Sequence, residues 1–130
     1  MIIGVGIDII DNRRIEKIIT KFGRKFKSKC FTEIEIKKSE NHIDSINFFS
    51  KRYAAKEAFS KALGTGFANG IYWKDIEIVN NDLGKPFIVL YNQTKLILSK
   101  ITNNNYKIFL SMSDEKNYSI ANVIIYKNEK

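Results

Sequence analysis

The sequence predicts an α+β fold in which a mainly antiparallel sheet packs against a long central helix. Two observations support this: short β-rich runs occur near both ends of the chain, and a long run rich in Ala, Phe, Lys and Glu lies between them. The chain has 130 residues and a mass of 15.1 kDa, which is the size of one ordinary domain. We therefore expect residues 1–130 to form a single domain.

The first predicted element is a strand over residues 2–10, because the apolar, β-rich run IIGVGIDII is typical of a strand buried on both faces. Asp11 can cap a helix directly after it. That helix is predicted from apolar residues that recur at helical spacing, namely Ile15, Ile18, Ile19 and Phe22.

Two further helices are predicted before the middle of the chain ends. Thr32 and Glu35 form the pattern of a capping box at the start of a second, more polar helix. Residues 46–63 have the composition of the long central helix, and Gly64 closes it.

The second half of the chain adds strands around one more helix. The expected elements are strand, strand, helix, strand and strand, over 75–80, 86–91, 93–102, 106–113 and 118–127. Asp82-Leu83-Gly84 forms the turn between the first two of these strands. Residues 114–117 join the last two into a hairpin.

The chain is basic, with 22 Lys and Arg against 14 Asp and Glu and a formal charge of +8. Such a charge attracts phosphates, nucleic acids, anionic membranes or acidic proteins. The basic residues are concentrated in the segment from Arg13 to Lys29, which contains eight of them and a single acid, Glu16. This distribution is more informative than the total charge.

The cellular compartment is expected to be the cytoplasm. Cys30 is the only cysteine, so no internal disulfide can form, which suits a reducing compartment. The apolar start of the chain has no basic leader and carries Asp8, unlike a signal peptide. No run approaches the roughly 18 apolar residues of a membrane span, so we expect no membrane insertion.

Asp8 is the first residue that suggests chemistry. It stands among isoleucines in a predicted strand, where an unpaired buried carboxylate would cost several kcal/mol. Two alternatives follow. Either Asp8 lies at the end of the strand, where it caps a helix or pairs with an arginine, or it holds a cation.

The central helix carries a second group of polar residues. Glu57 and Lys61 are four residues apart and share a helix face, which by itself indicates an ordinary exposed ion pair. The tripeptide Gly64-Thr65-Gly66 offers backbone N–H groups and a hydroxyl that can receive a phosphate, although it also fits a simple helix end. Two carboxylates from different elements, such as Asp8 and Glu57, suit Mg²⁺, which prefers oxygen ligands and shares substrate phosphates.

Four segments together resemble one known family. They are GVGIDIIDNRRIE, FFSKRYAAKEAFSKALGTG, DIEIVNNDLGKP and LSMSDEKNYSIANVII. In this order and spacing they are similar to the holo-(acyl-carrier-protein) synthases of the 4′-phosphopantetheinyl transferase superfamily. The resemblance spans nearly the whole chain and implies a transferase that moves 4′-phosphopantetheine from coenzyme A to a serine of apo acyl carrier protein. The products would be 3′,5′-adenosine bisphosphate and the holo carrier for fatty acid synthesis.

The resemblance also implies roles for individual residues. Asp8 and Glu57 would bind Mg²⁺ and, with Lys61, form the catalytic group. Contacts to coenzyme A would come from residues in three parts of the chain: Arg52, Lys61, Gly64, Thr65, Gly66, Lys85, Pro86 and Ser111. Plain structural roles remain open for several of these, a hairpin turn for Lys85 and Pro86 and an inward serine for Ser111.

The resemblance implies two kinds of protein partner. The acidic carrier would meet Arg14 and, with it, Arg13, Lys17, Lys21 and Arg24, which could otherwise form a merely solvated basic helix face. Members of the family form homotrimers with active sites between neighbouring subunits, so we expect a homotrimer.

One position departs from the family pattern. Many members have a histidine two residues before the position of Ser111, where this chain has Phe109. Some also have one at the position of Asp114. His42, the only histidine here, lies in a polar connecting segment and is expected at the surface, so we do not expect histidine-assisted proton transfer.

A small basic nucleic-acid-binding domain is the main alternative from another class. The aromatic residues argue against it, since those at helical positions are typical of a core: Phe22, Phe48, Phe49 and Phe59. No predicted strand combines aromatic and basic residues as single-strand readers do. We therefore expect no nucleic-acid partner.

Overall fold

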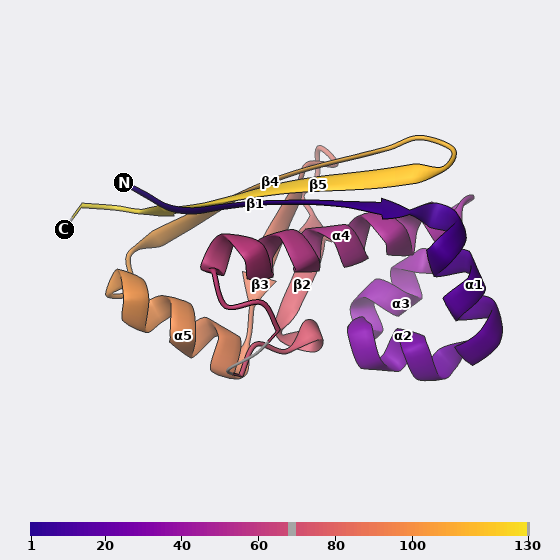
Figure 1. The fold of residues 1–130 in the computed structure, drawn as a ribbon, viewed down its shortest axis with the longest axis horizontal. Coiled ribbons are helices and arrows are strands. Elements are labelled where there is room, and N and C mark those ends of the chain that lie inside the picture. The colour runs from indigo at the N-terminus through magenta and orange to yellow at the C-terminus, as the bar shows by residue number, and fades with distance from the viewer. Residues whose placement is uncertain (68–69, 130) are drawn as a thin grey trace.

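The protein has two layers in the computed structural model, which describes residues 1–67 and 70–129. The first layer is an antiparallel sheet with the order β1-β5-β4, formed by β1 (Ile2–Asp11), β5 (Tyr118–Lys127) and β4 (Tyr106–Asp114). The second is the long helix α4 (Ser45–Leu63), which lies along one face of this sheet (Figure 1). The predicted α+β class, with a mainly antiparallel sheet on a long central helix, is confirmed.

The remaining helices lie at the two ends of this sandwich. α1 (Asn12–Phe22), α2 (Arg24–Cys30) and α3 (Glu33–Ser39) gather at one end, as Figure 1 shows. α5 (Asn92–Thr102) lies at the other end, on the side where both termini are found (Figure 1).

A second, two-stranded sheet passes behind α4 in the view of Figure 1. It is a hairpin of β2 (Ile76–Asn80) and β3 (Pro86–Leu90), preceded by a 3-10 turn at Trp73–Asp75 that the sequence analysis did not predict. The predicted turn between the strands is confirmed: Gly84 has a φ of 87°, and the Asn81 side chain accepts hydrogen bonds from two turn N–H groups, at 3.0 and 2.9 Å.

The helix boundaries follow the capping residues of the sequence. The Asp11 carboxylate accepts a 2.9 Å hydrogen bond from the Arg13 N–H at the start of α1. Thr32 and Glu35 form both hydrogen bonds of a capping box at the start of α3. Gly64 ends α4 in the left-handed region, with a φ of 87°. Local hydrogen bonding therefore determines these boundaries.

The basic segment is divided between two helices, which the sequence analysis did not foresee. Gly23 has a φ of 53°, outside the helical region, and separates α1 from α2. The expected docking residues therefore lie on two helix axes: Arg13, Arg14, Lys17 and Lys21 on α1, and Arg24 on α2.

The expectation that β1 is buried on both faces is wrong. Val5, Ile7 and Ile9 are 57, 54 and 63% exposed, and Ile10 on the opposite face is 5% exposed. β1 is an edge strand with one face on α4, so its apolar sequence does not reflect two covered faces in a single chain.

β1 approaches α4 closely because two glycines face the helix. A Cβ added to Gly4 would lie 1.7 Å from the Ala62 carbonyl oxygen, and one added to Gly6 would lie 1.9 Å from that of Ala58. Only a residue without a side chain fits at these two positions. The backbone of β1 therefore packs directly against α4 at Ala58 and Ala62.

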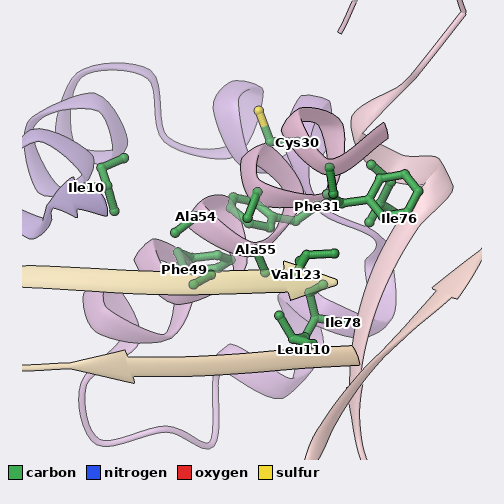
Figure 2. Packing of buried hydrophobic residues seen from close by; sticks show 14 of the residues in the cluster. Ile10, Cys30, Phe31, Phe49, Ala54, Ala55, Ile76, Ile78, Leu110 and Val123 are labelled. Atoms are coloured by element: carbon green, nitrogen blue, oxygen red, sulfur yellow. The ribbon is translucent and has the colours of Figure 1, made fainter. Parts of the chain in front are cut away.

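The hydrophobic core lies between α4, the inner face of the sheet and the small helices. Phe31 and Phe49, whose ring centroids are 4.8 Å apart, pack with Val123 in the view of Figure 2. The expected core positions of Phe48, Phe49 and Phe59 are confirmed. The expectation for Phe22 is wrong: this ring is 50% exposed at the end of α1, because the helix is interrupted directly after it.

Candidate active site

Asp8 faces α4 from β1. The strand register places it opposite Ala121, which is buried on the inner face of the sheet. Its side chain is 16% exposed, and its Oδ1 accepts a 3.0 Å hydrogen bond from Lys61 Nζ. The same ammonium group also donates to the Ile7 carbonyl at 3.1 Å. Asp8 is therefore paired with a lysine, rather than with an arginine or a helix end.

Glu57 shares the electrostatic environment of Asp8. Burial raises the pKa of the Glu57 carboxyl, the negative charge of Asp8 raises it further, and the positive charges of Lys61 and Arg14 partly offset these effects. Two carboxylates from different elements are thus near enough to repel each other, and Lys61 is bound to one of them, Asp8. Their mutual repulsion is the kind that a bound cation relieves.

The donor atoms at this point are few. No group of three or more His, Cys, Asp or Glu side chains suited to a metal occurs within residues 1–67 and 70–129. Asp8 and Glu57 alone would leave most coordination positions to water or to a ligand. That arrangement fits Mg²⁺, which keeps waters and shares substrate phosphates, better than a metal that needs a full set of protein ligands.

The α4 helix is not the solvated helix that its charges suggest. Lys56 is fully buried; its Nζ donates to Glu35 Oε1 at 2.7 Å, to the Cys30 carbonyl at 2.9 Å and to the Trp73 carbonyl at 3.1 Å. Burial lowers the pKa of Lys56, and the charge of Glu35 opposes this shift. The sequence analysis missed this ion pair. The signal for it was a lysine within the Ala- and Phe-rich run.

Arg52 is also buried, and its contacts are with residues other than Asp8 and Glu57. Its Nη2 donates to Asn80 Oδ1 at 2.8 Å, and its guanidinium lies 3.6 Å from the centre of the Phe48 ring. Burial lowers the pKa of Arg52 to about 10. Its Nε has no hydrogen-bond partner among the described residues. Arg52 lines a basic pocket together with Lys38, His42 and Lys51, among others.

The Gly64-Thr65-Gly66 loop forms a helix end. The N–H groups of Gly64 and Gly66 both donate to the Ser60 carbonyl, at 3.1 and 3.3 Å, and the Thr65 hydroxyl donates to the Gly66 carbonyl at 3.1 Å. These N–H groups already donate within the helix end, so they are not free phosphate donors in this conformation.

Lys85, Pro86 and Ser111 are brought together, but elsewhere. They line one groove between the β2–β3 hairpin and the outer face of β4, which also includes Phe109 and Asn122. Ser111 is paired with Asn122 on the outer face of the sheet, whereas Asp8 is on the inner face. Within one chain, the predicted site residues are therefore divided between the two faces of the sheet.

The predicted docking residues differ in whether an ion pair already holds their side chains. Arg13 is held by Asp11 at 2.8 Å, and Arg24 by Glu33 at 3.1 Å. Arg14 and Lys17 line a groove along α1. The positive charge of Arg14 also lowers the pKa of Glu57 slightly, so this end of α1 is electrostatically coupled to the carboxylates.

Two further expectations can be compared with the structure. His42 is exposed, as predicted, with its ring 5.1 Å from that of Phe48. Across the described part of the chain, no helix combines the length and the apolar character needed to cross a membrane.

Comparison with known proteins identifies the family of this chain. Residues 4–122 match the sequence model of the 4′-phosphopantetheinyl transferase superfamily. A holo-[acyl-carrier-protein] synthase of Bartonella bacilliformis is 49% identical over 127 residues, which cover 96% of this chain and 96% of the relative.

Solved structures give the same result. The crystal structure of a holo-[acyl-carrier-protein] synthase from Neisseria meningitidis matches with a TM-score of 0.87 and 35% identity, covering 98% of this chain and 100% of the other. A second such synthase, from Bacillus anthracis in complex with CoA (3′,5′-ADP), matches with a TM-score of 0.81 and 34% identity, covering 98% of this chain and 99% of that one. This chain belongs to the holo-(acyl-carrier-protein) synthase family of the 4′-phosphopantetheinyl transferase superfamily.

Proposed function

We propose that this protein transfers 4′-phosphopantetheine from coenzyme A to a serine of apo acyl carrier protein and releases 3′,5′-adenosine bisphosphate. The holo carrier would serve fatty acid synthesis in the cytoplasm, a compartment that suits the single cysteine. The observation that carries the proposal is the bond between Asp8 of β1 and Lys61 of α4, together with the effect of the Asp8 charge on the pKa of Glu57.

We further propose that Asp8 and Glu57 hold Mg²⁺. The raised pKa of Glu57, caused by burial and by Asp8, supports a site in which two carboxylates need a cation. When bound, Mg²⁺ would supply Lewis-acid stabilisation and a template for the diphosphate.

The side chains of the protein would mainly bind and orient the substrates. Lys61, about half exposed beside Asp8, can contact a coenzyme A phosphate. Arg52, with an unpartnered Nε, can contact another. Phosphoryl-type transfer needs chiefly positioning and charge stabilisation. Phe109 stands where many members have a histidine, so no histidine at that position can take the serine proton. Glu57 would assist its removal.

We propose that the working form is a homotrimer with sites between subunits. Ser111, Lys85 and Pro86 lie on the other side of the sheet from Asp8, so a neighbouring chain is needed to bring both sets together. The outer face of the sheet is suited to this contact. It carries exposed apolar side chains and the Asn122 Oδ1, which is buried without a partner among the described residues.

The oligomeric state can be measured directly. Light scattering should give three times the mass of the chain. Ile120→Glu, on the outer face of β5, should reduce that mass and the transfer activity together. Ile43→Glu, a fully exposed position outside the sheet, should change neither. A monomer that is fully active would contradict the proposal.

The transfer reaction is tested by weighing the carrier. Purified protein, Mg²⁺, coenzyme A and apo acyl carrier protein should yield a carrier heavier by one phosphopantetheine. Chelator, Asp8→Asn and Glu57→Gln should each abolish the gain, and Asp82→Asn in the β2–β3 turn should not. An unmodified carrier with the unaltered enzyme would contradict the proposed function.

A further inference from the structure

Three aromatic side chains stack beside the loop that follows α4. The Trp73 ring lies 3.8 Å from the Phe67 ring at an angle of 16°, and 4.7 Å from the Tyr53 ring at an angle of 26°. Both arrangements are close to parallel, a geometry in which aromatic rings attract one another beyond their burial. Trp73 therefore joins α4, through Tyr53, to the residue at the end of the loop.

Trp73 is a fixed platform. Its carbonyl accepts a 3.1 Å hydrogen bond from Lys56 Nζ, and that ammonium is held by Glu35 at 2.7 Å with both side chains fully buried. Tyr53 is one helical turn before Glu57 on α4, and burial together with the charge of Glu57 raises the pKa of Tyr53 to about 12. The platform is thus anchored to the same helix that carries the carboxylate of the candidate site.

The loop itself has few other anchors. Gly64 and Gly66 both have positive φ, 87° and 61°, a conformation that glycine adopts without steric cost. The hydrogen bonds described for residues 64–66 lead only to the last turn of α4 or to the loop itself. Stacking of Phe67 on Trp73 connects the end of this loop to a different element.

We propose that Phe67 is a positioning residue for coenzyme A: by stacking on Trp73 it holds the Gly64–Gly66 loop in the conformation that receives the nucleotide end of the substrate. This inference rests on the proposed function. Phe67 acts through the loop and not on the reacting atoms, so its loss should weaken the use of coenzyme A more than it slows the transfer step.

The single tryptophan provides a direct measure of the stack. In Phe67→Ala, we expect the KM for coenzyme A to rise about 3- to 10-fold, the range that follows from the energy of one aromatic pair. The value of kcat and the KM for the carrier should stay within about twofold. Quenching of Trp73 fluorescence by acrylamide should increase, because one face of the indole loses its cover.

Conservative and neighbouring variants separate stacking from general destabilisation. Phe67→Tyr keeps the ring and should restore both the KM and the quenching. Phe67→Leu keeps apolar bulk without a ring and should resemble Phe67→Ala. Tyr72→Ala removes a half-exposed ring from the same segment and should leave the KM unchanged.

The outcomes distinguish this inference from the proposed function. If the unaltered enzyme modifies the carrier but Phe67→Ala has an unchanged KM for coenzyme A, the positioning role is refuted and the function stands. Full restoration by Phe67→Leu would refute stacking as its cause. If the unaltered enzyme neither binds coenzyme A nor modifies the carrier, the proposed function itself fails.

Discussion

Burial shifts the pKa of three charged side chains of α4, Arg52, Lys56 and Glu57, in the direction that favours the neutral form of each. For Glu57, burial and then the charge of Asp8 raise the pKa. A carboxyl whose pKa is higher in the folded protein favours folding below its ordinary pKa of 4.5, and this contribution is lost as the pH rises toward the folded value. At neutral pH, the ionised form of Glu57 therefore lowers the stability of the folded, metal-free protein.

Replacing this carboxylate should stabilise the metal-free protein. Glu57→Gln should raise the melting temperature at pH 7 in the presence of chelator, because the repulsion with Asp8 and the desolvation of a charge are removed. The gain should shrink as the pH falls from the raised folded pKa toward 4.5, and it should be small below 4.5. Calorimetry across this pH range measures both effects.

The control for this prediction is Glu16→Gln, at an exposed position of α1, which should change the melting temperature little at any pH. Added Mg²⁺ should stabilise the unaltered protein and not Glu57→Gln. A loss of stability in Glu57→Gln at pH 7 would show that the carboxylate has a partner other than a cation.

Arg52 allows substrate binding to be separated from folding. Its burial lowers its pKa to about 10, and no carboxylate forms an ion pair with it among the described residues. In Arg52→Met, the lost contacts to Asn80 and Phe48 are offset by the relief of burying a charge, so the free energy of unfolding should change by no more than about 1 kcal/mol.

The same variant should use coenzyme A poorly. Losing a charged hydrogen bond to phosphate should raise the KM for coenzyme A by about 10- to 100-fold. Lys37→Met removes the same charge from an exposed position of α3 and is the matched control. Equal KM values for the two variants would mean that Arg52 has a structural role only.

At the scale of elements, the contact between β1 and α4 determines the site, since Asp8 and Glu57 lie on these two elements. Gly6→Ala would put a Cβ 1.9 Å from the Ala58 carbonyl oxygen. We expect a loss of stability of about 1–3 kcal/mol from overpacking, together with weaker transfer because β1 and Asp8 move away from α4. Chemical denaturation and the carrier assay measure the two effects.

The control here is Gly84→Ala. Gly84 has a positive φ of 87° but no neighbouring atom within 4 Å of an added Cβ, so this variant carries backbone strain without overlap, about 1 kcal/mol. If Gly6→Ala were no more destabilising than Gly84→Ala, the close approach of strand and helix would be disproved.

The elements that the sequence predicted correctly are those with local causes. Capping at Asp11 and Thr32, and the left-handed end at Gly64, involve hydrogen bonds or backbone angles within a few residues. The burial of Lys56 was missed because its partner Glu35 comes from another helix, 21 residues earlier. The prediction that β1 is buried on both faces was wrong for a single chain. An apolar sequence does not show whether a face is covered by the same chain or by a neighbouring one.

At the scale of the whole molecule, the sequence could not say how the site is assembled. The family resemblance assigns Asp8 and Ser111 to the same site. The register of β1, β5 and β4 nevertheless puts them on opposite faces of one sheet. Periodicity within a chain contains no information about neighbouring copies. The expectation of a homotrimer came only from the family resemblance, and the outer face of the sheet exposes apolar side chains that a neighbouring copy could cover.

The docking surface also belongs to this scale, because it depends on long-range charge. Arg14→Glu should raise the KM for the acidic carrier by at least about 10-fold at low salt and leave that for coenzyme A almost unchanged, with the difference shrinking as salt screens the charges. Lys100→Glu, at an exposed position of α5, reverses the same kind of charge and should have little effect. Equal changes in both KM values for Arg14→Glu would contradict the docking role.

The most direct test of the central claim is the binding of a divalent ion to β1 and α4 jointly. Mn²⁺ can replace Mg²⁺ as a paramagnetic probe and be titrated into the protein with coenzyme A present, while the relaxation of water protons is recorded. We predict one bound ion per chain, lost in Asp8→Asn and equally in Glu57→Gln, with the double variant no weaker than either. Binding that survives one of these substitutions unchanged would contradict a shared site.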